Sequence, residues 1–266
     1  MLKKTILYLL LLVSFAAQSQ IKKRHFKQRE IGLFGGGSYY IGDINPRAQF
    51  KFSHPAVGAF FRYSNNYRFA FRFGLNYGMI SADDKKSTEL DQLERNLNFR
   101  SRIYEFHLVS EFNFVEYRIG HSKHYMSMYI FGGLAGFYMN PQANIGNGYQ
   151  DLSGLKTEGQ NKSYSKIQIS IPFGVGFKWS IADYIGLSIE WGPRKTFTDY
   201  LDDVSGKYPL IGKGSVYSNQ SKDGVAYPGS MRGNPRTKDW YFYYGFMISF
   251  RLPTSNKECS EMGFGG

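Results

Sequence analysis

The sequence has few of the features that define helical membrane proteins and disulfide-rich secreted proteins. Cys259 is the only cysteine among 266 residues, so no disulfide can form within one chain. Beyond the N-terminal segment, no stretch approaches the roughly 18 consecutive apolar residues that indicate a membrane-spanning helix. No cysteine lies directly after the apolar N-terminal segment, which excludes a lipoprotein attachment site there. The sequence also contains no nucleic-acid-binding motif.

The N-terminus has the pattern of a secretory signal peptide. Two lysines precede an apolar segment at residues 5–15, which is too short to cross a bilayer, and small residues stand before Gln20. We therefore place a signal peptide at residues 1–19, with a retained membrane anchor as the alternative. Its removal leaves 31 basic and 21 acidic residues, a formal charge of +10. A basic exported chain suits anionic lipid head groups or an acidic partner, and export argues against nucleic acid as a partner.

Aromatic residues make up 18% of the chain, and glycine occurs 30 times. This composition is typical of a β-rich protein with aromatic belts. Residues 167–191 carry the clearest pattern, because apolar side chains occupy every second position on both sides of a turn at residues 182–184. This predicts a β-hairpin with one apolar face and one polar or small face. Its first arm has the length of a tilted strand that crosses a bilayer, roughly 9–11 residues or more, so we expect the apolar face to contact lipid.

Eight strands are predicted, near residues 30–41, 55–63, 69–79, 104–114, 125–139, 167–181, 185–197 and 240–251. The fifth of them is apolar on both faces, so its orientation stays open. The connections alternate between short turns and long loops, as in bacterial outer-membrane barrels. We therefore predict an all-β fold, an eight-stranded antiparallel transmembrane β-barrel with short periplasmic turns and long extracellular loops. A secreted β-sandwich is the alternative.

This topology predicts how the chain is divided and where it is located. We expect a signal peptide (1–19), a periplasmic lead-in (20–28), an outer-membrane barrel (29–251) and a periplasmic tail (252–266), with both termini in the periplasm. Three tryptophans lie on the apolar face of their strands, as the belts at a membrane interface require. They are Trp179, near a periplasmic turn, and Trp191 and Trp240, toward the rim with long loops.

The lumen of an eight-stranded barrel is just wide enough to be filled by side chains. The polar residues predicted to point inward are Arg72, Glu105, His107, Glu111, Lys178 and Glu190. Lys178 and Glu190 are diagonal neighbours across the predicted hairpin, within reach of each other. Because an unpaired buried charge is costly, we interpret the set as a paired, structural polar plug. An ion or proton path is the alternative.

No catalytic, cofactor or metal site is expected from the sequence. The tightest histidine cluster, residues 121–124 (HSKH), could supply a nucleophile with its base or half a metal site. It falls on a predicted periplasmic turn with no adjacent carboxylate to orient it, so we interpret it as a solvated turn. The Gly35–Gly37 run lies within a strand and opens no helix, so it fails as a phosphate-binding loop. Cys259 lies in the predicted periplasmic tail, where an odd cysteine indicates a reactive thiol or a disulfide to a partner.

Three stretches resemble a known family: residues 30–45 (EIGLFGGGSYYIGDIN), 194–208 (RKTFTDYLDDVSGKY) and 232–252 (RGNPRTKDWYFYYGFMISFRL). Together they are similar to the PorG-like outer-membrane proteins of the bacterial type IX secretion system. The resemblance implies a noncatalytic barrel without a cofactor or a small-molecule substrate. It further implies association with the periplasmic ring of that export machine, built from an outer-membrane lipoprotein and its soluble partner. The implied role is to tie the ring to the outer membrane.

Two other functions remain open from the sequence. A free-standing barrel could stabilise the envelope or adhere through its long loops, and this alternative assigns function to the loop at residues 201–238. A lipid-modifying enzyme would need a polar cluster near the outer leaflet, and no such cluster is evident in the sequence.

Overall fold

The computed structural model describes residues 27–146, 148–210, 217–221 and 228–253. Outside the described residues lie the predicted signal peptide, nearly all of the lead-in, and residues 254–266 of the tail, which include Cys259. Within the described part of the chain, no helix combines the length and apolar character that crossing a membrane requires.

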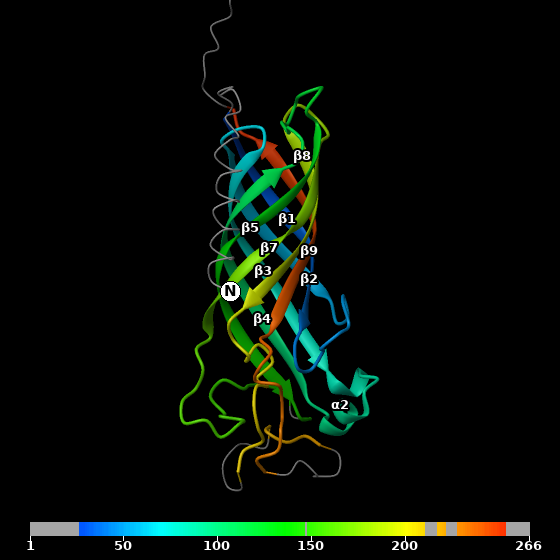
Figure 1. The fold of residues 1–266 in the computed structure, drawn as a ribbon, viewed down its shortest axis with the longest axis vertical. Helices are drawn as coiled ribbons and strands as arrows, with labels where there is room; N and C mark the ends of the chain where they lie inside the picture. The colour runs from blue at the N-terminus through cyan, green and yellow to red at the C-terminus, as the bar shows by residue number, and fades with distance from the viewer. Residues whose placement is uncertain (1–26, 147, 211–216, 222–227, 254–266) are drawn as a thin grey trace, which may run out of the picture.

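Eight long antiparallel strands close into a barrel, which confirms the predicted fold class (Figure 1). Neighbours along the chain pair with each other, and the ring is closed by pairing of the first long strand with the last. The strands are β1 (Gln28–Ile41), β2 (His54–Ser64), β3 (Phe69–Asp83), β4 (Asn98–Asn113), β5 (Met126–Asn144), β7 (Ile167–Ser180), β8 (Ile185–Thr196) and β9 (Trp240–Arg251).

Three short elements occur where the sequence predicted only loops. A 3-10 helix, η1 (Asp84–Lys86), begins where the Asp83 side chain accepts a hydrogen bond from the backbone N–H of Lys85, and the helix α2 (Leu90–Arg95) follows it. A short strand, β6 (Tyr149–Asp151), pairs with the far end of β5. Elements of three to six residues are too short to show a helix or strand period in the sequence. The prediction that these segments are loops was therefore wrong at these positions.

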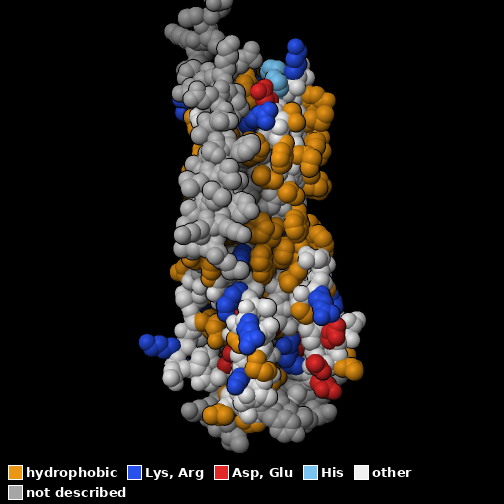
Figure 2. All heavy atoms as spheres, in the orientation of Figure 1, with side chains coloured by type: hydrophobic (Ala, Val, Ile, Leu, Met, Phe, Trp, Pro, Cys, Tyr) orange, Lys and Arg blue, Asp and Glu red, His pale blue; other side chains and the backbone are white. Residues whose placement is uncertain are grey.

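Side chains along most of the barrel wall alternate between lumen and exterior, with runs of buried residues in β1, β8 and β9. On β5, which the sequence left without an orientation, Tyr129 and Phe131 point inward, whereas Ile130 and Leu134 are exposed. The exposed side chains of all eight strands are mostly aliphatic or aromatic. In Figure 2 they form an apolar band, with most of the charged side chains gathered toward the two ends. An apolar belt around the outside of a barrel is the surface that a lipid environment requires.

The two rims differ in the length of their connections. The turns at residues 65–68 and 181–184 are short, whereas residues 42–53, 84–97, 145–166 and 197–239 form long connections at the other rim. The β4–β5 connection, residues 114–125, is longer than the short turn predicted there. It folds into the barrel mouth, so that Tyr117 and Ile119 are buried. The last barrel strand ends at this rim, since the N–H of Leu252 donates to the carbonyl of Arg29.

β1 and β9 approach each other closely where two glycines face each other across the ladder. Gly36 pairs with Gly245, and a Cβ atom on Gly36 would lie 2.0 Å from the carbonyl oxygen of Tyr244 and 2.6 Å from the Cα of Gly245. A Cβ atom on the adjacent Gly35 would meet nothing within 4 Å. The glycine run of this strand therefore serves strand packing, at the seam that closes the barrel.

We expect Gly36→Ala to lower the free energy of unfolding by about 1–3 kcal/mol, because the backbone of β1 or β9 must shift to admit the methyl group. Gly35→Ala is the matched control and should leave stability within about 0.5 kcal/mol. Urea unfolding of the barrel in lipid vesicles, followed by tryptophan fluorescence, measures both. Equal stability of the two variants would contradict this account of the seam.

Candidate functional site

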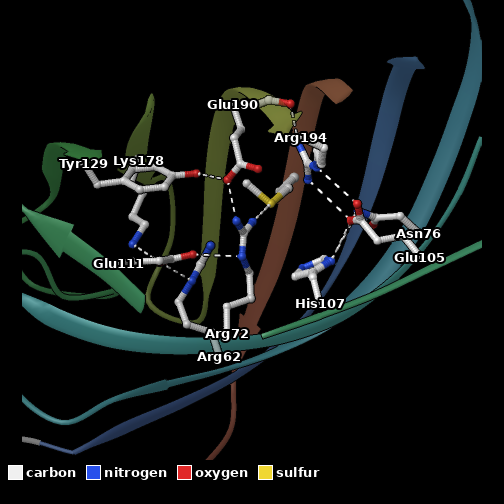
Figure 3. Close-up of polar contacts among 12 residues, drawn as sticks. Arg62, Arg72, Asn76, Glu105, His107, Glu111, Tyr129, Lys178, Glu190 and Arg194 are labelled. Carbon is white, nitrogen blue, oxygen red and sulfur yellow. Dashed lines mark hydrogen bonds and ion pairs between the residues drawn. The ribbon is translucent and has the colours of Figure 1, made fainter. Parts of the chain in front are cut away.

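Charged side chains fill the middle of the barrel, and Glu111 of β4 lies at their centre (Figure 3). Its carboxylate oxygens lie 2.9 Å from Nε of Arg62, 3.0 Å from Nε of Arg72 and 2.5 Å from Nζ of Lys178. These cations come from β2, β3 and β7, so the contacts cross the lumen as well as following the wall. One carboxylate therefore holds three strands together from the inside.

Two further glutamates satisfy the arginines on either side. The Nη1 of Arg62 lies 2.7 Å from Oε2 of Glu30, and the Nη2 of Arg72 lies 2.7 Å from Oε2 of Glu190. Glu190 also accepts a 2.8 Å hydrogen bond from the hydroxyl of Tyr129. Each arginine is thus shared between two carboxylates, and the chain of ion pairs runs across the whole lumen.

A second cluster forms around Glu105, nearer the rim with long loops. Its Oε2 lies 3.2 Å from Nε of Arg194 and accepts a 2.8 Å hydrogen bond from the hydroxyl of Tyr241. Its Oε1 lies 3.0 Å from Nδ1 of His107 and accepts a 3.0 Å hydrogen bond from the amide of Asn76. This carboxylate is fully occupied by partners from four other positions on the wall.

The charges in the lumen balance. The buried carboxylates Glu30, Glu105, Glu111 and Glu190 face the buried cations Arg62, Arg72, Lys178 and Arg194. Charges taken out of water are tolerated only when they are paired and hydrogen-bonded. Each of these eight groups has at least one oppositely charged partner within 3.2 Å.

The structure places all six sequence-predicted lumen residues inside the barrel and in contact with this network. The register confirms that Lys178 and Glu190 are diagonal neighbours on β7 and β8, but each forms its ion pair with a residue across the lumen. Six further members of the network were not among the predicted plug residues, although the inward parity of most of their strands could have identified them. They are Glu30, Arg62, Asn76, Tyr129, Arg194 and Tyr241.

Little space remains between these side chains. A cavity of about 10 Å³ is lined by Phe34, Phe60, His107 and Tyr243 among others, which is room for about one water molecule. The Nε2 of His107 and the hydroxyl of Tyr243 are buried without a hydrogen-bond partner among the described residues. One water between them would satisfy both.

The rim with long loops is closed by a cap, which we define as residues 197–206 together with the side chains that bind them. At its base, the hydroxyl of Tyr40 lies 2.5 Å from Oδ2 of Asp202 and 3.0 Å from Oδ1 of Asp239. A phenol carries one proton and cannot donate to both carboxylates. This arrangement favours a proton on one of the two carboxyl groups, and burial raises the pKa of both.

The same carboxyl groups fix the backbone of the cap. Asp202 accepts a 2.9 Å hydrogen bond from the N–H of Val204, and Asp239 accepts a 3.0 Å hydrogen bond from the N–H of Leu201. Burial, and secondarily the nearby charge of Asp43, raises the pKa of Asp202 well above its usual range. Burial also raises the pKa of Asp43 to about 6. The cap is therefore built around carboxyl groups that favour the neutral form.

An arginine from the far end of the loop ties the cap to the β5–β7 connection. The Nη1 of Arg232 lies 3.2 Å from Oε1 of Glu158 and donates a 2.5 Å hydrogen bond to the carbonyl of Asp203. Glu158 also accepts hydrogen bonds from the N–H groups of Ser205 and Gly206, at 2.8 and 3.0 Å. Most of the family-like motif at residues 194–208 therefore lies in this structure at the rim.

The predicted interface belt lies on the outer surface. Trp179 and Trp191 are 37% and 38% exposed, and Trp240 is half-buried at the start of β9. Trp191 donates a 3.0 Å hydrogen bond to the hydroxyl of Tyr39, which is stacked on Phe242 with ring centroids 4.5 Å apart. Trp179 and Trp240 lie toward opposite rims, where belts at the two membrane interfaces would be.

The histidine cluster sits at the rim with short turns, where it was predicted. The rings of His121 and His124 are 4.5 Å apart, and Nε2 of His124 lies 3.4 Å from Oε2 of Glu116. Among the described residues, no group of three or more His, Cys, Asp or Glu side chains has a geometry that could hold a metal ion. The cluster is a surface contact between turn residues.

Comparison with known proteins gives one family. The model of the family described as "Domain of unknown function (DUF6089)" matches residues 3–261 of the chain. The chain belongs to this family. Among curated proteins, no relative of this DUF6089 chain is found.

Solved structures similar to the DUF6089 chain include three barrels. Ail, the attachment invasion locus protein of Yersinia pestis, in complex with the heparin analogue sucrose octasulfate, has a TM-score of 0.42 at 8% identity, over 85% of this chain and 99% of that chain. Neisserial surface protein A has a TM-score of 0.39 at 8% identity, over 85% and 97%. The outer membrane protein OprG from Pseudomonas aeruginosa has a TM-score of 0.41 at 10% identity, over 86% and 98%.

We expect Glu111→Gln to destabilise the DUF6089 barrel by about 3–5 kcal/mol, because the substitution leaves buried cations without their shared carboxylate. Glu94→Gln, on the exposed face of α2, is the matched control and should change stability by less than about 0.5 kcal/mol. Removing one cation in addition, as Glu111→Gln with Lys178→Met, should recover part of the loss. Urea unfolding in vesicles measures the free energy of unfolding of all three variants. A decrease of less than about 1 kcal/mol in Glu111→Gln alone would contradict a central role for Glu111.

We expect the cap to loosen as the pH rises from about 4 to 7. The carboxyl groups of Asp43, Asp202 and Asp203 have raised pKa values in the folded chain, about 6 for Asp43 and Asp203, against about 3.9 in an unfolded chain. Folding then binds protons, so the stability that these groups contribute is present at low pH and is lost as the pH rises through this window. Hydrogen exchange of the Leu201 and Val204 amides, corrected for intrinsic rates, measures this.

Asp202→Asn mimics the protonated carboxyl group and should weaken that pH dependence, with greater protection than wild type at pH 7. The amide oxygen can accept from the N–H of Val204 while the NH₂ group donates to Tyr40. Asp183→Asn, on an exposed turn at the opposite rim, is the control and should behave as wild type. An unchanged pH profile in Asp202→Asn would refute the shared proton.

Proposed function

We propose that the chain is a noncatalytic outer-membrane component of the type IX protein secretion machinery. In this proposal the barrel lies in the outer membrane with both termini in the periplasm. It ties the periplasmic ring, made of an outer-membrane lipoprotein and its soluble partner, to that membrane. The observation that carries the proposal is a sealed barrel with an apolar exterior, which can anchor a complex but offers nothing to transport or transform.

The apolar exterior supports the membrane location. Leu33, Leu75, Leu134 and Phe246, on four different strands, are each 59–69% exposed. Side chains of this kind cost free energy in water and are stabilised by lipid. A soluble protein rarely exposes an apolar surface that continues around its whole circumference.

The closed lumen supports an anchoring role over a channel or an enzyme. Ion pairs fill its middle, the cap covers one mouth, and Tyr117 and Ile119 lie in the other mouth. Each of the eight charged groups in the middle of the lumen has an oppositely charged partner, which supports a structural role for these side chains. A function in binding is left to the two ends of the barrel.

The three family-like stretches are neighbours in space. Residues 30–45 contain most of β1, residues 232–252 contain β9, and residues 194–208 leave β8 to form the cap. β9 pairs with both β1 and β8. The resemblance to PorG-like proteins therefore covers one continuous part of the wall and the structure that closes it, and this adjacency favours a shared architecture over chance matches.

In this arrangement the ring would meet the rim with short turns. The described residues of that surface are the turns at residues 65–68 and 181–184 and the connection at residues 114–125, where the polar side chains of Ser122, Lys123 and Asp183 are exposed. The predicted partner disulfide of Cys259 would belong to the same side of the membrane. Cys259→Ser, analysed by nonreducing electrophoresis of cell envelopes, tests whether any reducible higher-mass band depends on that thiol.

We expect mild-detergent affinity purification of the tagged protein to recover the ring lipoprotein in fixed proportion, as identified by mass spectrometry. Lys123→Glu, at the rim with short turns, should reduce that recovery several-fold, because reversing a charge at the edge of an interface opposes association. Lys162→Glu, an equal charge reversal at the rim with long loops, is the matched control and should leave recovery unchanged.

Recovery of the barrel alone, under conditions that keep the ring intact, would overturn the proposal. Function would then be assigned to the rim with long loops, as in a free-standing barrel that stabilises the envelope or adheres. The structured cap at that rim is the feature that such a role would use.

A further inference from the structure

A polar cleft opens at the rim with long loops, beside Asn96 at the end of α2. Its volume is about 690 Å³, within the range of about 300–1,000 Å³ that ligand pockets occupy. Six parts of the chain meet there: Phe52, the end of β3 with η1, Asn96 with the start of β4, the end of β5, Tyr149 of β6, and residues 219–220. The cleft lies outside the sealed lumen and takes no part in the ion-pair network.

Side-chain amides form a rigid floor for this cleft. Asn98 donates from Nδ2 to the carbonyl of Asn144 at 2.9 Å and accepts at Oδ1 from the N–H of Asn144 at 3.0 Å. These two bonds continue the β4–β5 ladder through a side chain. Asn98 also donates to Oε1 of Gln220 at 3.1 Å, and Asn96 donates to the Gln220 carbonyl at 2.7 Å. The floor is therefore held in place before any ligand arrives.

One acceptor on this floor lacks a donor. The Oδ1 of Asn96 is buried and makes no hydrogen bond to the described residues. Asn96 ends α2 in the left-handed backbone conformation, with φ of 58°, and its amide nitrogen is already bound to Gln220. A buried acceptor costs free energy unless a donor reaches it. The geometry therefore favours a ligand that brings an O–H or N–H group.

The rim of the cleft is basic and aromatic. Phe52 lies between two lysines, with Nζ of Lys51 5.2 Å and Nζ of Lys86 5.4 Å from the ring centroid, and Lys85 is exposed beside them. The φ of Phe52 is 56°, a strained conformation for an aromatic residue, and such strain persists at sites that use it. On the opposite wall, the guanidinium of Arg100 lies 3.5 Å from the centroid of the Tyr149 ring.

We infer that this cleft binds an anionic saccharide. Sugar hydroxyls donate and accept hydrogen bonds as the side-chain amides require, and the apolar faces of sugar rings pack against aromatic side chains. Phosphate or carboxylate groups on the saccharide pair with the lysines in charge-assisted contacts. The proposal does not depend on the secretion role, because it concerns the opposite rim. The saccharide can belong to a lipopolysaccharide in the same membrane or to a free polysaccharide.

Isothermal titration of the full chain in detergent tests the inference with three probes. These are the phosphorylated core oligosaccharide released from lipopolysaccharide, an oligouronate as a free acidic glycan, and a neutral maltooligosaccharide of equal length. We expect binding of at least one anionic probe and no measurable binding of the neutral one. The tighter of the two anionic probes identifies the source. Affinity should fall with added salt.

Two variants locate the binding. Lys85→Glu with Lys86→Glu should weaken binding at least about tenfold, since two attractive charges become repulsive. Asn96→Gly keeps the left-handed backbone, removes the unsatisfied acceptor, and should also weaken binding. The matched control reverses two exposed lysines outside the cleft, Lys162→Glu with Lys207→Glu, for the same change in net charge. Retained heat-modifiable migration in electrophoresis shows that each variant is folded.

Three results would overturn the inference. The first is no binding of either anionic probe, or equal binding of the neutral one. The second is an equal loss of affinity in the control, which would mean that only the overall field attracts the probe. The third is undiminished binding in both cleft variants, which would place the contact elsewhere on the barrel.

Discussion

The ion pairs of Glu111 are the constraint on which the rest of the barrel depends. The apolar exterior leaves the lumen as the place for charged side chains in the middle of the wall, and a narrow lumen provides too little water to solvate them. The chain meets this limit by giving each charge more than one partner, so that Glu111 is shared by Arg62, Arg72 and Lys178. The network is stable only when complete. The same contacts that pair these charges also hold the strands together from the inside.

The cap differs from the lumen, because its central carboxyl groups meet at a tyrosine hydroxyl and not at a cation. Asp202 and Asp239 approach the same tyrosine hydroxyl, and two ionised carboxylates could not both do so without strong repulsion. Arg232 and Glu158 supply the ionic part of the cap farther from the barrel axis. In the lumen, arginine and lysine side chains neutralise the glutamates. In the cap, burial raises the pKa of a central carboxyl group, so we expect the stability of the cap to change with pH. Stability of the wall and stability of the cap are separable properties of this fold.

Strand parity predicted most of the wall, because alternation is a local property of the sequence. It gave the eight strands, the outward tryptophans and the inward position of residues such as Arg72 and Glu105. It could not give the partners across the lumen, which depend on how the closed barrel brings distant strands face to face. Lys178 shows the difference: its diagonal neighbour on β8 is Glu190, yet its partner is Glu111 on β4. β6 and α2 were missed for another reason, since three to six residues are too few for a period to be visible.

The two rims differ in structure, and this difference bears on function. At the rim with short turns, Tyr117 and Ile119 are drawn into the mouth, and a compact surface remains. At the other rim, long connections build a cap, a carboxyl pair with a shared proton and an open polar cleft with an unsatisfied amide oxygen. A barrel that served only as an inert anchor would need no such structure on the side away from its partner. An anchor that also contacts saccharide at the opposite surface would need both rims, because each contact would hold the barrel against one side of the membrane.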